Sequence, residues 1–334
     1  MSTKIIYLRL TDRCQLNCDH CYDVDNRSGC MISNDAWRVA FNYVLEYKYQ
    51  GHDVEVQLHG GEPMLNDSLK EVYENVQKLV KLGAKVSCTT NLCYAITDNM
   101  WRIFELFDNK LILTSWDYNI RFKTDVQELT WEYNVQLLKD KGFNVQPIIT
   151  VTKPLIENMK PMEIFGYMKA LGLNRLNFER LTPNGNAVKN EAMIRPTNRQ
   201  VDAWLTQAYK DYKLRFNEFE VPLFIGLELA KQGELTGCRA RQCTCNVRTI
   251  NTHGDVATCP NIAKCLVLPN LMRHENDMYI RKFRENLDTL QATESTRHDE
   301  CYICPHFKVC NGDCFQLAWD NTGCPGLKGI LEVL

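Results

Sequence analysis

The chain has 334 residues, 45% of them hydrophobic, and its 39 Lys and Arg against 41 Asp and Glu give a formal net charge of −2. This balance provides no basic field for nucleic acid or anionic lipid, and no apolar run reaches the ~18 residues of a membrane span. We therefore expect no nucleic-acid and no membrane partner. Because the N-terminus also lacks the apolar core of a secretory signal peptide, we expect a cytoplasmic protein.

Cysteine is the unusual residue of this composition. There are 16 cysteines, and most lie either at 14–21 or between 238 and 324. In a reducing compartment so many thiols are metal ligands more often than disulfides. The distribution indicates metal sites at both ends of the chain, whereas we expect Cys30, Cys88, Cys93 and Cys265 to be small buried side chains.

Segments with the apolar or alternating pattern of β-strands recur through the first 181 residues, with helical patterns between them. Strands that alternate with helices predict a parallel sheet with right-handed crossovers, whose active site lies at the carboxyl ends of the strands. The expected strands cover 5–10, 54–58, 85–91, 111–117, 145–151 and 176–181, and the expected helices cover about 34–45, 67–82, 97–107, 125–141 and 158–171.

A long polar helix is expected at about 198–217, after which the periodicity weakens and cysteines return. We place the domain boundary near 225–237. The chain is therefore expected to consist of an α/β domain at 1–230 and a small cysteine-rich domain at 231–334.

The first cysteine cluster directly follows the first expected strand. It reads Cys14-Gln15-Leu16-Asn17-Cys18-Asp19-His20-Cys21, a CxxxCxxC loop. Three thiolates this close in sequence can bind three corners of an iron–sulfur cube and leave the fourth iron open, as catalytic metal sites do. The alternatives are a zinc site or buried thiols, although zinc sites rarely use this spacing.

The loop, with the aromatic His20 before its last cysteine, resembles the radical S-adenosylmethionine (radical SAM) superfamily. The resemblance implies a partial (β/α)6 TIM-like barrel, open on one side, that binds a [4Fe–4S] cluster and SAM. Gly60-Gly61-Glu62-Pro63 matches the family's GGEP motif. In similar enzymes this segment holds the amino group of SAM. The Glu62 carboxylate could accept a hydrogen bond from that group.

Further cofactor-binding candidates follow from the same resemblance. Asn91 resembles the asparagine after the third strand, and Ser115 and Asp117 resemble a Ser-x-Asp segment that reaches the ribose. Arg121 could pair with the SAM carboxylate. Asn184-Gly185-Asn186-Ala187 resembles a turn on the adenine side. Each of these residues could equally be a solvated loop residue.

The C-terminal cysteines resemble the SPASM domain, which carries two auxiliary [4Fe–4S] clusters and brings the expected total to three. By position, Cys245, Cys259 and Cys314 would bind the first auxiliary cluster with Cys238, which we prefer to Cys243 as fourth ligand. Cys301, Cys304, Cys310 and Cys324 would bind the second. The alternative is a pair of crossed zinc sites, because Cys301-x2-Cys304 alone fits zinc equally well.

The resemblance implies reductive cleavage of SAM to a 5′-deoxyadenosyl radical, which takes a hydrogen atom from the substrate, with the auxiliary clusters as electron acceptors. We expect oxidation or cross-linking of a peptide or protein, with a flavodoxin- or ferredoxin-type reductant. The same chemistry on a small metabolite, such as an amino sugar or nucleoside, is the alternative. A more remote alternative is a non-catalytic zinc- or cluster-bearing interaction protein.

The general base is not evident from the motifs. Sulfatase maturases lack the leader-binding domain that we also do not expect before this barrel. They have an Asp base directly after the second SPASM cysteine, where this chain has Pro260. Glu179, His253 and Asp255 are the candidates that could take its place.

Overall fold

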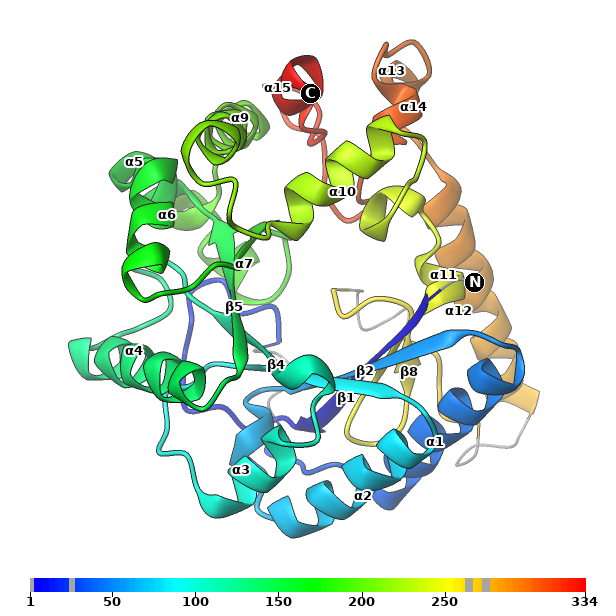
Figure 1. Ribbon diagram of the computed structural model, residues 1–334. Coiled ribbons are helices and arrows are strands. Elements are labelled where there is room, and N and C mark those ends of the chain that lie inside the picture. Colours follow the sequence, from blue (N-terminus) through cyan, green and yellow to red (C-terminus); the bar gives the residue numbers. More distant parts are fainter. Residues whose placement is uncertain (1–2, 24–27, 262–266, 272–276) are drawn as a thin grey trace.

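The computed structural model describes residues 3–23, 28–261, 267–271 and 277–334, which fold around one curved sheet (Figure 1). The strand order is β6-β5-β4-β3-β2-β1-β7-β8, and every neighbouring pair from β6 to β7 is parallel. The predicted strands are all present, as β1 (Thr3–Thr11), β2 (Asp53–Gly60), β3 (Lys85–Thr90), β4 (Leu111–Ser115), β5 (Asn144–Val151) and β6 (Asn177–Arg180). The predicted open (β/α)6 barrel is therefore confirmed.

Helices follow the strands and cover the outside of the sheet, as Figure 1 shows. Side-chain caps begin several of them: Ser33 accepts from the Ala36 amide and Thr197 from the Gln200 amide. The predicted helix at 158–171 begins instead at Pro161, because proline suits the first turn of a helix. The helices of this part are α1 (Asn34–Tyr49), α2 (Leu69–Lys81), α3 (Asp98–Phe104), α4 (Asp125–Asp140), α5 (Lys153–Asn158), α6 (Pro161–Ala170), α7 (Asn186–Lys189), α8 (Glu191–Ile194) and α9 (Asn198–Arg215).

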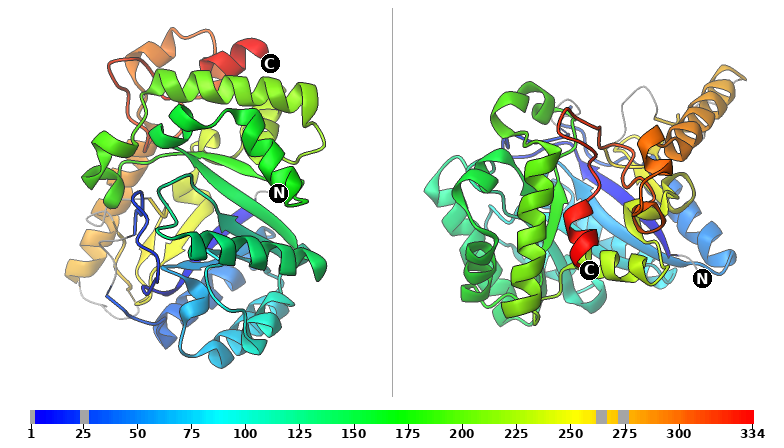
Figure 2. Two further views of the ribbon diagram at one scale, coloured as in Figure 1. Left: turned by 90° about the vertical axis from the view of Figure 1, so that its left-hand side faces the viewer. Right: turned by 90° about the horizontal axis from the view of Figure 1, so that it is seen from above.

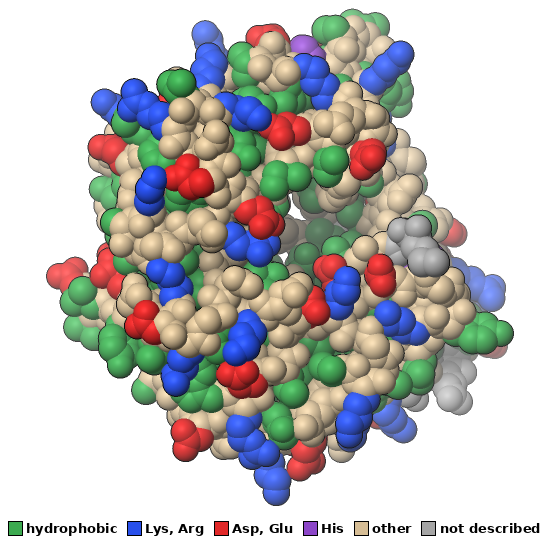
Figure 3. Space-filling model, in the orientation of Figure 1, with side chains coloured by type: hydrophobic (Ala, Val, Ile, Leu, Met, Phe, Trp, Pro, Cys, Tyr) green, Lys and Arg blue, Asp and Glu red, His purple; other side chains and the backbone are tan. Residues whose placement is uncertain are grey.

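The alternation of side chains along the strands separates the core from the barrel interior. On β1, Ile6 and Leu8 are fully buried against the helices, so Tyr7 between them faces the interior. On β6, Phe178 packs against Trp204 and Phe224 on the outer side. The interior is open, and the space-filling view shows a hollow at the centre of the molecule (Figure 3).

The C-terminal part extends the same sheet. Strand β7 pairs in parallel with β1, and β8 returns antiparallel to β7. The predicted boundary at 230/231 falls at the end of α10, and it stays a prediction. The elements here, several of them not expected from the sequence, are α10 (Pro222–Lys231), α11 (Cys243–Asn246), β7 (Val247–Ile250), β8 (Val256–Ala257), α12 (Asp277–Ser295), α13 (Asp299–Tyr302), α14 (Phe307–Cys310) and α15 (Lys328–Val333).

The chain end returns to the barrel wall. Helix α15 packs against α9, and the two lie together in both views of Figure 2. The barrel and the cysteine-rich part therefore share a sheet edge and a helix contact. In the described ranges, no helix is both long and apolar enough to cross a membrane.

Candidate active site

The CxxxCxxC loop leaves the carboxyl end of β1 and is fixed there by the GGEP segment. The amide of Gly61 donates to the Thr11 carbonyl at 2.8 Å, and that of Glu62 donates to the Arg13 carbonyl at 2.7 Å. A Cβ atom on Gly60 would lie 2.4 Å from the Thr11 carbonyl oxygen, and one on Gly61 2.2 Å from that of Arg13. Glycine is therefore required here by the backbone entering the cysteine loop, in addition to any ligand.

Glu62 has a different environment from the one expected. Its side chain is fully buried and accepts from the amides of Met64 (3.1 Å) and Asn91 (2.7 Å) and from the Thr90 hydroxyl (2.8 Å). Burial raises its pKa to about 7 despite these bonds. These protein donors hold the carboxylate in place, and the expected contact between Glu62 and a ligand stays a prediction. Pro63 begins the 3-10 turn Pro63–Leu65 that Glu62 caps.

Arg121, after β4, lies against the cysteine loop. Its Nε donates to Asp117 Oδ2 at 2.6 Å, its Nη1 lies 3.7 Å from the Cys18 sulfur, and its Nη2 lies 3.3 Å from Nε2 of His20. Burial acts to raise the pKa of Asp117, but Arg121 and His20 hold it below its ordinary value. Burial lowers the pKa of His20 to about 4, so His20 is neutral at pH 7.

Asp117 and Asn91 are used within the protein, whereas Ser115 is available. Asp117 also accepts from the Thr150 amide at 2.7 Å, which joins the ends of β4 and β5. Asn91 lies 3.8 Å from the Cys14 sulfur through its Nδ2 and also bonds to Gln15. Ser115 is the half-buried last residue of β4. The expected cofactor residues thus surround the cysteine loop, although several of them bind each other.

The turn at 184–187 supports the cysteine loop directly. The Asn186 amide donates to the Cys21 carbonyl at 2.9 Å, and its side chain donates to the Cys18 carbonyl at 3.0 Å. Asn190 donates to the Asp19 carbonyl at 2.9 Å. Gly185 has φ +55, and a Cβ there would lie 2.4 Å from the Cys21 carbonyl oxygen. No local motif indicates this role of Asn186 and Asn190.

The cysteines expected to bind the second auxiliary cluster line one pocket with an empty volume of about 400 Å³. Gly326 lies against them, because a Cβ on it would be 2.9 Å from the Cys310 sulfur. Burial raises the pKa of Cys310 to about 12. These lining cysteines are Cys301, Cys304, Cys310 and Cys324.

A second thiol group lies beside β1 and differs from the expected one by a single cysteine. The Cys238 thiol donates to the Cys314 sulfur, which lowers the pKa of Cys314 to about 7. Cys243 is close to Cys259 and Cys314, and burial raises its pKa to about 12. Cys245 is exposed on the Tyr47 side.

Helix α11 explains this separation. Residues two apart on a helix point to opposite sides, so Cys243 and Cys245 cannot face the same group. The expected ligand Cys245 therefore points away from this thiol group, whereas Cys243 faces it. Among the other cysteines, Cys88 is fully buried in the core, and Cys265 lies outside the described residues.

The donor sets suit iron–sulfur clusters. The β1 loop supplies three thiols and no further cysteine of its own, and the C-terminal part supplies two groups of four. Thiolates are the protein ligands of iron–sulfur clusters, so these are the residues that could hold the expected clusters. Among the residues that the structure describes, no three His, Cys, Asp or Glu side chains are close enough to hold a single metal ion.

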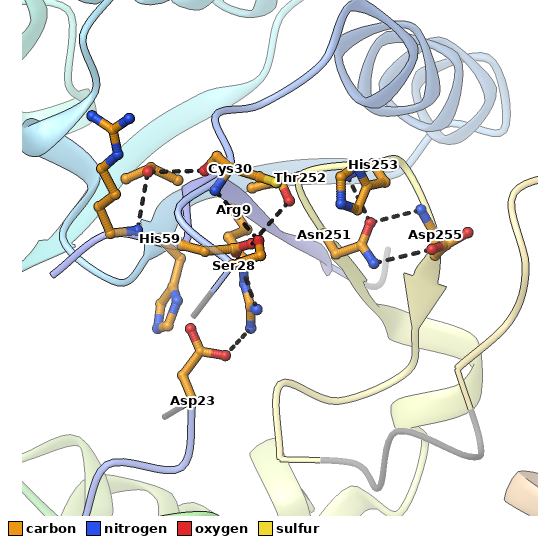
Figure 4. Close-up of polar contacts among 12 residues, drawn as sticks. Arg9, Asp23, Ser28, Cys30, His59, Asn251, Thr252, His253 and Asp255 are labelled. Atoms are coloured by element: carbon orange, nitrogen blue, oxygen red, sulfur yellow. Dashed lines mark hydrogen bonds and ion pairs between the residues drawn. The ribbon is translucent and has the colours of Figure 1, made fainter. Parts of the chain in front are cut away.

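The general-base candidates lie in different places. Figure 4 shows His253 and Asp255 in the β7–β8 turn, where Asp255 accepts from Asn251 Nδ2 at 3.1 Å and from the Asn270 amide at 2.9 Å. Glu179 instead faces the barrel interior, because Phe178 before it packs outward. Burial, followed by Asp117, raises the pKa of Glu179 above its ordinary value.

Another polar group at the strand ends was not identified from the sequence. Tyr22 bonds to His59 through its hydroxyl and Nε2 at 2.8 Å, and burial lowers the pKa of His59 to about 3. Beside them, Arg9 pairs with Asp23 at 2.6 Å, and His59 lies on the same side of the sheet in Figure 4. These residues line the barrel mouth next to the cysteine loop.

Comparison with known proteins gives relatives of the whole fold. No family model matches the chain. An uncharacterized protein of Methanocaldococcus jannaschii, MJ0907, is 23% identical over 282 residues, which cover 80% of this chain and 88% of that protein. The structure of anSMEcpe with bound AdoMet (SAM) has a TM-score of 0.77 at 18% identity, covering 99% of this chain and 96% of that one.

Two further structures contain peptides. The complex of anSMEcpe with AdoMet and the Cp18Cys peptide has a TM-score of 0.74 at 18% identity and covers 99% of this chain and 96% of that one. Streptococcus suis SuiB bound to the precursor peptide SuiA has a TM-score of 0.60 at 17% identity and covers 94% of this chain and 72% of that chain. At these identities the likeness establishes the shared fold.

Proposed function

We propose that the chain is a radical SAM enzyme with a SPASM-type C-terminal region that oxidises or cross-links a peptide or protein. One observation carries the proposal: the CxxxCxxC loop stands at the end of β1 in a fold that aligns with an AdoMet-bound structure over 99% of this chain. A zinc- or cluster-bearing interaction protein would not need the neutral His20 and the partly buried Arg121 beside that loop.

In this proposal Cys14, Cys18 and Cys21 hold the SAM-binding cluster in the barrel of residues 1–230. Residues 231–334 hold two auxiliary clusters. The first is bound by Cys238, Cys243, Cys259 and Cys314, and the second by Cys301, Cys304, Cys310 and Cys324. When reduced, the SAM-binding cluster at Cys14, Cys18 and Cys21 would supply the electron that cleaves SAM to a 5′-deoxyadenosyl radical. A flavodoxin- or ferredoxin-type protein would supply that electron.

The residues of the chain would then orient the reactants and handle the proton. Arg121 carries positive charge beside Cys18, and the loop carbonyls are held by Asn186 and Asn190. Among the candidate bases, only Glu179 faces the interior, so we assign it as the proton acceptor. Its raised pKa makes it a stronger base than a glutamate of ordinary pKa.

The peptide substrate is supported by the two peptide complexes that share this fold. The open barrel interior supplies a place for an extended segment (Figure 3). A test with synthetic peptides that carry Ser, Cys or Lys at the centre, followed by mass spectrometry, would favour the proposal if a loss of two hydrogens or a cross-link forms. Turnover of amino sugars or nucleosides without any turnover of peptides would favour the small-metabolite alternative.

The cofactor part of the proposal is tested on protein purified without oxygen. We expect about twelve irons per chain and cleavage of SAM to 5′-deoxyadenosine after reduction. A variant with Cys14, Cys18 and Cys21 replaced by Ala is the matched control, with about eight irons and no cleavage. A colourless protein with stoichiometric zinc would contradict the proposal.

A further inference from the structure

A buried group of charges joins the two C-terminal thiol groups to the barrel. Asp313 is 1% exposed and accepts from both terminal nitrogens of Arg180, at 2.6 and 3.0 Å. Arg239, 8% exposed, donates to the same carboxylate at 3.0 Å. These two guanidinium groups and one carboxylate carry a net charge of +1, and the Glu179 carboxyl group is near Arg180. Such a charge is costly unless negative groups compensate it.

Each member of this charge group lies next to a cysteine of the candidate cluster sites. Arg239 directly follows Cys238, and Asp313 directly precedes Cys314 and accepts from its amide at 2.7 Å. The Asp313 amide donates to the Cys310 carbonyl at 2.8 Å. The charge group therefore contacts the backbone of ligands from both thiol groups.

Arg180 connects the remaining partners. It is the last residue of β6 and donates to the Pro325 carbonyl at 2.8 Å, directly after Cys324. Neighbouring side chains fix the loop from the other side, since Arg241 donates to the Gly312 carbonyl at 2.9 Å and Asn311 to the Arg239 carbonyl at 2.8 Å. A strand of the barrel is thus tied to the segment that lies between both sets of thiols.

One nitrogen of the charge group has no protein partner. The Nε of Arg239 is buried and makes no hydrogen bond with the residues that the structure describes. The Arg239 guanidinium is near Cys310, and that of Arg180 is near Cys310, Cys314 and Cys238. A buried N–H without a partner is costly, so this donor points to an acceptor other than the residues that the structure describes.

We propose that Arg180, Asp313 and Arg239 form a positioning group that sets the reduction potentials of both auxiliary clusters and couples these clusters to the barrel. This inference rests on the proposed function. Net positive charge and N–H donors to sulfur both favour the reduced, more negative state of an iron–sulfur cluster. The two arginines therefore raise the reduction potentials of the clusters, which suits clusters that accept an electron from the substrate side.

The experiment uses the variant with Cys14, Cys18 and Cys21 replaced by Ala, in which the auxiliary clusters alone contribute signals. Redox titration followed by electron paramagnetic resonance gives their midpoint potentials. We expect Arg239→Gln to keep about eight irons. The midpoint potential of the more affected cluster should fall by ~59 mV for one electron. This corresponds to an about tenfold fall in the ratio of reduced to oxidised cluster at the wild-type midpoint. Arg175→Gln, at a partly exposed pair with Glu220, is the control and should not shift it.

Two further variants separate charge from hydrogen bonding and from folding. Arg239→Lys keeps the charge but not the planar Nε donor. If the midpoint potential shifts in both Arg239→Gln and Arg239→Lys, the effect belongs to the donor. If it shifts in Arg239→Gln alone, the effect belongs to the charge. Asp313→Asn should lower iron content at both auxiliary sites, because two buried arginines lose their partner. Potentials and iron content equal to those of Arg175→Gln in all three variants would overturn the inference.

Failure of the proposed function gives a different result. If the background variant binds no iron at its C-terminal cysteines, the assignment of auxiliary clusters fails before any arginine is changed. If it binds iron and the arginine variants behave like the control, only the role of the charge group fails.

Discussion

The two cysteine-rich regions are held in place by different forces. The loop at Cys14–Cys21 is fixed by hydrogen bonds to its backbone, from the GGEP segment after β2 and from Asn186 and Asn190 after β6. The C-terminal thiols lie on short irregular elements and are fixed by buried charges, chiefly Asp313 with its two arginines. Elements at the edge of a regular sheet can donate hydrogen bonds to the backbone of the cysteine loop. Short loops need strong contacts between side chains to reach a defined geometry.

The largest expected effect of a single change is at the N-terminal loop. Cys18→Ala should abolish SAM cleavage and remove about four irons, because the SAM-binding cube loses one of only three ligands. The measurement is 5′-deoxyadenosine formation with iron analysis. Cys30→Ala serves as a control that should retain both. SAM cleavage by Cys18→Ala at the wild-type rate would remove the basis for treating this loop as the catalytic region.

The C-terminal region should respond differently. Cys310→Ala should still cleave SAM but lose the oxidised product, since its cluster would accept an electron and not bind SAM. The ratio of product to 5′-deoxyadenosine measures this uncoupling. If Cys310→Ala turned over substrate normally, the electron-acceptor role of the second auxiliary site would be wrong.

Glu179→Gln should reduce product formation by about 10²-fold or more, because a general base is lost while the folded barrel remains. Burial raises the pKa of Glu179, and a base must be deprotonated. Activity of the wild type should therefore fall as pH decreases through that raised pKa, at higher pH than for a glutamate of ordinary pKa. The pH profile of product formation checks this sign. Glu179→Asp should keep the acidic limb, and the same limb in Glu179→Gln would exclude this role.

Two nearby cysteines, Cys243 and Cys245, differ in their expected contribution to the first auxiliary cluster. Cys243→Ala should lose about four irons, whereas Cys245→Ala should keep them all, because α11 directs the two side chains to opposite sides. Iron analysis and absorption spectra are sufficient. The reverse result would restore Cys245, the ligand favoured by sequence spacing.

The smallest effect concerns the glycines of the GGEP segment. Gly61→Ala should destabilise the protein by about 2 kcal/mol, since its Cβ would meet the Arg13 carbonyl. Gly166→Ala is the matched control: Gly166 lies inside α6 with no atom near the added methyl, and alanine there should be neutral or stabilising. Urea unfolding under anaerobic conditions measures both. Equal stability of the two variants would mean that the loop contact has no energetic weight.

Much of the barrel could be predicted from the sequence, because its strands and helices carry clear periodicities and the polar residues follow strand ends. The motif residues indicated the chemistry in the same way. The contacts that these motif residues make with one another were not predictable. Glu62 binds Asn91 and Thr90, and Asp117 binds Arg121, contacts that join separate strands and have no local signature.

The C-terminal part was less predictable for a physical reason. Spacing between cysteines does not give the direction of a side chain, and that direction depends on the single turn of α11 that separates Cys243 from Cys245. Asp313 and Arg180 are 133 positions apart, so their pairing depends on the tertiary fold. Strand β7 was missed because its four residues lack a periodic pattern of useful length.

Mössbauer spectra of the ⁵⁷Fe-enriched protein, recorded with and without SAM, test the central claim most directly. If the β1 loop holds a cube with one iron free of protein ligands, SAM should change the spectrum of about one iron in twelve. The variant with Ala at positions 14, 18 and 21 should show no change. Spectra that are identical with and without SAM in the wild type, or that contain no iron assigned to this loop, would contradict the account.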